Sequence, residues 1–202
     1  MARTRLGIQS AASAALALAV LAAPAAATST HARDHRPARA GFAGLRAWAG
    51  VEARERDQGP VLPLIGKPDY GTAENAFGAA RDGHVHEGQD ILAPAGTPLV
   101  AVTEGVIAET GTDGSEGNYV YLYDRGRDRT YVYMHMIEPA TVSAGDEVKA
   151  GQRLGAVGCT GSCWGDHLHF EIRDGRGIGG SAHDPLPELR DWKPLERPRS
   201  EG

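Results

Sequence analysis

The chain has 202 residues, with 26 acidic side chains, 21 basic side chains and a formal net charge of −5. This length suits one domain with extensions, and the acidic balance argues against a general nucleic-acid binder, which normally carries a basic patch. The 27 glycines and the 6% aromatic content favour a turn-rich β protein over a helical bundle.

The first 27 residues have the layout of a secretory signal peptide. Arg3 and Arg5 make the start positive, residues 11–23 form an apolar run, and Ala25-Ala26-Ala27 offers a small-residue cleavage site. We expect cleavage after Ala27 and a secreted protein with no stable insertion in a membrane. The alternative is an uncleaved membrane anchor, for which the apolar run is short.

Residues 28–58 read as a flexible linker with one weak helix, and residues 191–202 read as a loose, charged tail. Between them we expect one compact domain, residues 59–190. It begins with the extended segment Gly59–Pro63, because proline disfavours helix there.

Short β-like runs alternate with glycine turns from Asp90 onward. Strands this close together, with no helix-length segment between them, predict an antiparallel all-β domain. The expected strands are Pro98–Val102, Gly105–Glu109, Asn118–Tyr123, Thr130–Met136, Arg153–Gly158 and His167–Arg173.

The last of these strands carries two histidines on its polar face. His167, His169 and Glu171 alternate with apolar residues, so the two imidazoles lie on one face, about 7 Å apart at the backbone. That spacing suits one metal ligand beside one acid or base. The alternative is a surface strand whose polar face happens to hold two histidines.

Cys159 and Cys163 are the only cysteines. In a secreted chain, a closely spaced pair most often forms a disulfide, and this one would fix the loop that leads into the histidine strand. The alternative is a zinc site built from both cysteines with His167 and His169, which an oxidising compartment disfavours.

A second cluster of polar residues is His86-Glu87-Gly88-Gln89-Asp90. In a straight strand, His86 and Asp90 would lie about 13 Å apart and could not reach one ion. We expect a turn at Gly88 to bring them together, since glycine permits unusual backbone angles. The alternative is a polar loop without chemistry.

With His169 added, two imidazoles and one carboxylate make a three-ligand set that leaves a fourth position for water. This pattern is typical of a catalytic zinc site, with one zinc ion per chain. The metal would polarise a carbonyl and lower the pKa of a bound water.

A hydrolase also needs groups that transfer protons. Alternation over residues 130–135 places Tyr131, Tyr133 and His135 on one strand face. His135 and His167 would then be two spare imidazoles near the metal, and histidine titrates near neutral pH. The alternative for His135 is a structural histidine.

Together these residues resemble a known family. The motifs His86-x-Gly88-x-Asp90, Tyr133-x-His135 and His167-Leu168-His169-Phe170 occur in the order seen in the lysostaphin/LytM-type peptidoglycan metallo-endopeptidases. The runs Ala93–Pro98, Gly117–Val120, Gly145–Val148 and Gly151–Gly155 match as well. The resemblance covers residues 60–185.

The resemblance implies an antiparallel, barrel-sandwich-like β domain with a zinc site in a narrow groove. By matched position, His86, Asp90 and His169 bind zinc, His167 is the general base, and His135 orients the water and stabilises the oxyanion. The roles of the two catalytic histidines could be exchanged. The groove would also include Tyr133, Asn118 and Trp164; the alternative for Trp164 is a residue that only packs within its loop.

The implied reaction is hydrolysis of an amide bond in a peptidoglycan stem peptide or cross-bridge, by a secreted enzyme associated with the cell wall. One alternative is a non-catalytic LytM-like domain that binds the wall or activates a partner hydrolase; any regulatory partner stays unidentified. A second alternative is a biotinyl or lipoyl carrier, suggested by residues 142–151, in which Lys149 lacks the expected context at a hairpin tip.

Overall fold

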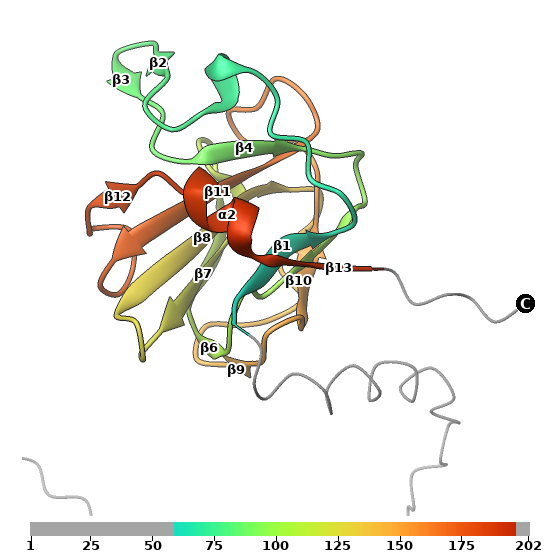
Figure 1. Cartoon of the computed structure of the whole chain (residues 1–202), viewed down its shortest axis with the longest axis vertical. Coiled ribbons are helices and arrows are strands. Elements are labelled where there is room, and N and C mark those ends of the chain that lie inside the picture. Colours follow the sequence, from blue (N-terminus) through green and yellow to red (C-terminus); the bar gives the residue numbers. More distant parts are fainter. Residues whose placement is uncertain (1–58, 197–202) are drawn as a thin grey trace, which may run out of the picture. The chain divides into compact units, whose positions relative to one another are not determined.

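The structure is a computed structural model that describes residues 59–196 (Figure 1). The expected signal peptide, the linker to residue 58 and the last six residues of the tail lie outside the described residues. Within residues 59–196, no helix is long and apolar enough to cross a membrane.

A large antiparallel sheet forms one side of the domain and carries the histidine strand. Its strand order is β12-β11-β8-β7-β6-β9. Strand β4 also pairs with β11, on the same side of β11 as β12 but along a different part of the strand. The bounds are β4 Gln89–Leu92, β6 Gly105–Asp113, β7 Gly117–Asp124, β8 Arg129–Met136, β9 Glu147–Val148, β11 His167–Asp174 and β12 Ala182–His183.

A second sheet has the order β10-β5-β1-β13, and its β1 and β13 run parallel. Its strands are β1 Val61–Ile65, β5 Pro98–Val100, β10 Arg153–Ala156 and β13 Lys193–Leu195. The remaining elements are the hairpin of β2 Ala80–Arg81 and β3 His84–Val85, the 3-10 helix η1 Ala73–Asn75 and the helix α2 Leu186–Asp191. Figure 1 draws α2 in front of the strands near the centre of the domain, and Leu189 of this helix is buried in the main core.

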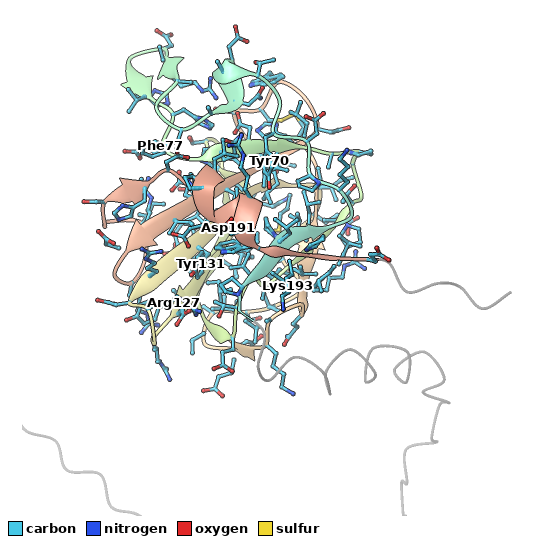
Figure 2. All side chains as sticks on the ribbon, in the orientation of Figure 1. Tyr70, Phe77, Arg127, Tyr131, Asp191 and Lys193 are labelled. Atoms are coloured by element: carbon cyan, nitrogen blue, oxygen red, sulfur yellow. A yellow bond between two sulfur atoms is a disulfide. The ribbon has the colours of Figure 1, made fainter. Side chains whose placement is uncertain are left out.

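The main core contains side chains from both sheets and from α2. Tyr131, labelled in Figure 2, stacks on Phe170 with ring centroids 6.3 Å apart and meets Trp192 edge to face at 5.9 Å. Phe170 also meets Tyr133 at 5.3 Å. Because β8 and β11 place these rings on the core-facing side of the large sheet, the alternate residues of both strands lie on the opposite side. On that side β11 has polar residues, whereas Val132 and Met134 of β8 form a small apolar cluster with Tyr121.

The predicted all-β class is confirmed, and each of the six expected strands is present with ends shifted by a few residues. The expectation of a loose tail from residue 191 is wrong for Lys193–Leu195, which forms β13 and pairs with β1. Helix α2 and strand β4 were not predicted. Both are short, and β4 owes its form to pairing with β11 rather than to its own pattern.

Strand β8 contains a bulge beside the histidine strand. Val120 of β7 pairs with Tyr133, but the next pair is Asn118 with Met136, so two residues of β8 oppose one of β7. His135 lies in this bulge with φ of 64°, in the left-handed region. Histidine is one of the few residue types enriched there.

The bulge reverses one prediction from the sequence. Alternation placed His135 on the same face as Tyr131 and Tyr133, and that prediction is wrong. The two tyrosines face the core, whereas the ring of His135 lies 4.9 Å from the ring of His167 and 5.9 Å from that of His169. The left-handed residue re-aims the imidazole to the opposite face.

Candidate metal and catalytic site

The register of β4 against β11 builds the centre of the site. Asp90 is the direct cross-strand partner of His169. Residues directly opposite each other in an antiparallel pair project on the same face. The Oδ1 atom of Asp90 therefore lies 3.0 Å from Nδ1 of His169, and both side chains are buried.

His86 completes the group from the segment between β3 and β4. Its Nε2 atom lies 2.9 Å from Oδ1 of Asp90 and 2.9 Å from Nδ1 of His169. Its Nδ1 atom lies 2.9 Å from the carbonyl oxygen of Ala76, which fixes the ring. The three predicted metal ligands thus converge, with their ligand atoms all within 4.8 Å of one another.

Gly88 is needed here for a different reason from the predicted one. It does not have a positive φ, so the unusual backbone angles expected from the sequence are not what the turn requires. A Cβ atom at this position would instead lie 2.6 Å from the carbonyl oxygen of Phe170 and 2.7 Å from Nε2 of His169. Glycine allows the His86 segment to lie directly against β11.

The proton arrangement of this group fits a metal ion. A carbonyl oxygen can only accept, so Nδ1 of His86 carries the hydrogen and the Nε2 atom of the neutral ring presents a lone pair. Nε2 of His169 likewise donates to Oε1 of Glu171, at 2.9 Å. At most one proton is then shared among the three converging atoms of His86, His169 and Asp90. A cation in that position would take the place of this shared proton and meet the lone pairs of the three atoms.

A chain of ionised side chains continues outward from His169. Glu171 accepts from His169 through Oε1 and from Nε of Arg173 through Oε2, at 2.5 Å. Arg173 also donates to Glu87, at 2.5 Å. On the other side, Arg81 from β2 donates to Oδ2 of Asp90, at 3.0 Å. Each carboxylate oxygen of Glu171 and Asp90 therefore has a defined partner.

These contacts shift the pKa values of the central groups. Burial opposes ionisation of Asp90, but hydrogen bonds with His169 and His86 outweigh it and hold the pKa of Asp90 well below its usual range. Burial likewise opposes the charge on His169, but hydrogen bonds with Asp90 and Glu171 raise its pKa to about 9. Without metal, the imidazole ring of His169 therefore keeps a proton that a bound metal ion would replace.

His135 and His167 lie next to this group, each held by a backbone carbonyl. Nδ1 of His135 donates to the oxygen of Thr160 at 2.8 Å, and Nδ1 of His167 donates to that of Gly165 at 2.7 Å. Nε2 of His167 lies 3.6 Å from Oδ1 of Asp90. Burial lowers the pKa of His135 to about 4, so this ring is neutral at neutral pH.

A cavity of about 600 Å³ opens over these side chains. Trp164 lies on its rim, is 67% exposed and stacks on the ring of His167 with centroids 5.7 Å apart. Trp164, which we predicted as a groove residue, thus lines the cavity, and its contact with substrate stays a prediction. Glu116 also lines the cavity and accepts from the hydroxyl of Tyr121 through both carboxylate oxygens, at 2.7 and 2.6 Å.

Two predicted groove residues lie elsewhere. Tyr133 is fully buried in the core, where its hydroxyl accepts from the backbone N–H of Val102 at 3.0 Å. Asn118 is buried beside the bulge, and its amide nitrogen donates to the carbonyl oxygen of Met136 at 3.0 Å. Neither side chain lines the cavity, because strand alternation and the bulge direct both away from it.

Cys159 and Cys163 form a disulfide, as predicted, which excludes the alternative zinc site that used their thiolates. The sequence interpretation missed Glu171 and Arg173 as supporting residues. Their signal was present: both continue the polar face of the strand at the same two-residue spacing as His167 and His169. Arg81 and Glu87 gave no such signal, since only the fold brings them to the site.

Comparison with known proteins places this geometry in a family. The model of "Peptidase family M23" matches residues 84–185, which is half of the chain. The glycyl-glycine endopeptidase ALE-1 of Staphylococcus capitis is 35% identical over 125 residues, which are 61% of this chain and 34% of that protein. The peptidoglycan DD-endopeptidase ShyC of Vibrio cholerae is 40% identical over 89 residues, which are 43% of this chain and 20% of that protein. The match thus spans about a third of the length of one relative and a fifth of the other.

Solved structures give the same result. The catalytic domain of lysostaphin from Staphylococcus simulans is 34% identical and aligns with a TM-score of 0.53, over 61% of this chain and 92% of that domain. A putative glycyl-glycine endopeptidase from Ruminococcus gnavus, 26% identical, aligns with a TM-score of 0.58 over 71% of this chain and 65% of that one. From its matched segment, its fold and its converging histidines and aspartate, the chain belongs to peptidase family M23.

Proposed function

We propose that the chain is a secreted zinc-dependent endopeptidase that hydrolyses amide bonds in the peptides of peptidoglycan. The observation that carries the proposal is the buried convergence of His86, Asp90 and His169, whose ligand atoms lie within 4.8 Å of one another. Two imidazoles and a carboxylate are the donor set of catalytic zinc sites that keep one position open. Their neighbours His135 and His167 are the proton-transfer groups that such a reaction requires.

When bound, zinc supplies Lewis-acid chemistry, polarising the scissile carbonyl and lowering the pKa of the attacking water. His86, Asp90 and His169 hold the ion, and the Nδ1–H of His86 and Nε2–H of His169 are fixed by Ala76 and Glu171. Such partners orient ligand rings and raise their basicity.

The chain's own proton transfers fall to His167 and His135. Since both Nδ1 atoms donate to carbonyl oxygens, both Nε2 atoms carry lone pairs. We assign His167 as the general base that takes the proton of the water and then gives it to the leaving amine. Neutral His135 accepts a hydrogen bond from the water and orients it. An oxyanion-stabilising role for His135 would require protonation, against its pKa of about 4.

The substrate class rests on the relatives, whose printed names include a glycyl-glycine endopeptidase and a peptidoglycan DD-endopeptidase. In this chain, the exposed face of Trp164 beside His167 offers an apolar contact for an extended peptide. A non-catalytic wall-binding or activator domain is the less favoured alternative, because all five ligand and catalytic positions are filled.

Mass spectrometry of products tests the proposal. Residues 28–202 would be incubated with purified peptidoglycan of several cross-link types, with zinc, with a chelator, and with zinc restored. We expect new peptide N-termini that vanish with the chelator and return with zinc, and their sequence identifies the bond. If the chain binds one zinc ion yet releases no product from any type of peptidoglycan, the endopeptidase proposal is contradicted. That result would favour the alternative of a non-catalytic activator domain.

A further inference from the structure

One short loop contacts both proposed catalytic histidines. We call residues 159–165 the Cys loop; the Cys159–Cys163 disulfide closes its first five residues. The carbonyl oxygen of Thr160 accepts from Nδ1 of His135, and that of Gly165 accepts from Nδ1 of His167. Two rings from different strands thus take their hydrogen-bond partners from the same loop.

These two carbonyls determine which nitrogen of each ring carries the proton. A carbonyl oxygen only accepts, so it selects the tautomer with hydrogen on Nδ1 and leaves the lone pair on Nε2. The Nε2 atom of His167 lies 3.6 Å from Oδ1 of Asp90, next to the proposed metal ligands. If the Gly165 carbonyl moves away, the other tautomer becomes accessible, and that tautomer cannot accept a proton at Nε2.

The first half of the Cys loop is anchored without help from the disulfide. The Oγ1 atom of Thr160 accepts from the backbone N–H of Asn118 at 2.9 Å and donates to the carbonyl oxygen of Met136 at 2.8 Å. The N–H of Ser162 donates to Ser115 at 2.9 Å. At Gly117 a Cβ atom would lie 2.3 Å from Oγ1 of Thr160, so this half of the loop lies directly against the β6–β7 turn.

The second half has a different support. The backbone N–H of Cys163 donates to Gly161, at 3.0 Å, so this bond stays inside the loop. Trp164 is exposed, and a Cβ atom at Gly165 would meet no atom within 4 Å, so the carbonyl of Gly165 lies in a loosely packed segment. Sγ of Cys163 lies 3.0 Å from that carbonyl oxygen and 3.8 Å from Nδ1 of His167. The disulfide therefore ties the chain immediately before Gly165 to Cys159.

We propose that the Cys159–Cys163 disulfide is a positioning element for His167: it holds the Gly165 carbonyl where it fixes the tautomer and orientation of that ring. His135 is positioned separately, through the side chain of Thr160. The inference rests on the proposed function for the role of His167, while the geometry of the two carbonyls stands without it.

A pair of variants separates the two supports. Cys159→Ala with Cys163→Ala removes the disulfide and leaves no free thiol to compete for the Gly165 carbonyl. Thr160→Val removes the two Oγ1 hydrogen bonds and keeps the disulfide. Both are made in the zinc-loaded chain and measured for zinc content, kcat, KM and the ring ¹⁵N and ¹H signals of His135 and His167.

For the double alanine variant, we expect kcat to fall roughly tenfold to a hundredfold, the range for losing a partner that orients an active-site ligand. KM and zinc content should stay within about twofold of the native values. The Nδ1–H signal of His167 should weaken or exchange, while that of His135 persists. Thr160→Val should reverse the pattern, perturbing His135 and sparing His167.

The proposal is overturned if the double variant keeps native kcat, if both rings change together, or if the variant loses zinc or cooperative unfolding. The last result would make the disulfide a general requirement of the fold. A native chain that cleaves no peptidoglycan refutes the proposed function instead, and the tautomer comparison can then still be read from the ring signals alone.

Discussion

The two halves of the site are held in different ways. The ligand group of His86, Asp90 and His169 is supported mainly by ionised side chains, with Arg81 on one side and the Glu171–Arg173 pair on the other. The proposed catalytic pair of His135 and His167 is supported by backbone carbonyls of one loop.

The difference fits the role proposed for each half. A cation site needs fixed negative charge and rings whose lone pairs point inward, and buried carboxylates with charged partners provide both. A proton-transfer ring must change its charge during the reaction. A neutral carbonyl fixes the tautomer of such a ring without locking its charge, as a carboxylate partner would tend to do. Each prediction below affects one half and leaves the other half intact.

The largest effect is expected from Asp90→Asn. The amide keeps the shape of the side chain but removes the negative charge that faces His86 and His169, so zinc should be lost. Activity should fall at least about a thousandfold, since Lewis-acid stabilisation contributes several kcal/mol. The zinc content of the purified variant and its release of peptides from peptidoglycan are measured to check both effects. Asp82→Asn, an exposed carboxylate on the cavity rim, is the matched control; an active, zinc-loaded Asp90→Asn would exclude Asp90 as a ligand.

Substitutions of His167 and His135 should lower turnover without removing the metal ion. His167→Ala should lower kcat by about a hundredfold to ten-thousandfold, the usual contribution of a general base, with one zinc ion still bound. His135→Asn should act in the same direction, and asparagine tolerates the left-handed backbone at that position. Metal content and kcat are measured on the same sample. Loss of zinc from His167→Ala would mean that base and ligand have been exchanged.

The sequence predicted the two histidines of β11 better than the histidine of β8. The spacing of His167 and His169, together with alternation along one strand, placed both rings on one face, and β11 has that arrangement. The pairing of Asp90 with His169 could not be derived, because β4 is four residues long and its register depends on a partner 79 residues away.

His135 shows where strand alternation fails. A period of two is valid only in a regular strand, and the bulge inserts one extra residue at this position. The family resemblance also suggested Tyr133 as a groove residue, but its hydroxyl accepts from the backbone N–H of Val102 in the core. No local pattern in residues 130–136 signals the bulge, which becomes evident only from the pairing of β7 with β8.

A smaller effect is expected from Glu171→Gln, which tests the support of the ligand half. The neutral amide is a weaker acceptor for the Nε2–H of His169 and removes one of the two ion pairs of Arg173, which keeps its pair with Glu87. Zinc affinity should fall roughly tenfold to a hundredfold, with the fold retained. Competition with a zinc-binding dye gives the affinity. The control is Glu109→Gln, an exposed carboxylate bonded to Tyr119; equal affinities for native protein and Glu171→Gln would show that this carboxylate does not support the site.

The smallest effect concerns how the free energy of unfolding depends on pH. It isolates the contribution that comes from burying the His135 ring. The pKa of His135 falls from 6.5 to about 4 on folding, chiefly because burial disfavours its charge. Below pH 6.5 the unfolded chain therefore binds a proton that the folded chain does not, and stability is lost as the pH falls.

Between pH 6.5 and 5.5 this linkage lowers the free energy of unfolding by about 1 kcal/mol. His135→Asn cannot titrate, so the variant should lose about 1 kcal/mol less than the native chain over that interval. Urea unfolding of both proteins in chelator at the two pH values gives the difference, free of zinc linkage. His169 and Asp90 keep their contributions in both proteins and cancel. Equal pH dependence would mean that His135 is charged in the fold, and the neutral, water-orienting role assigned to it would then be wrong.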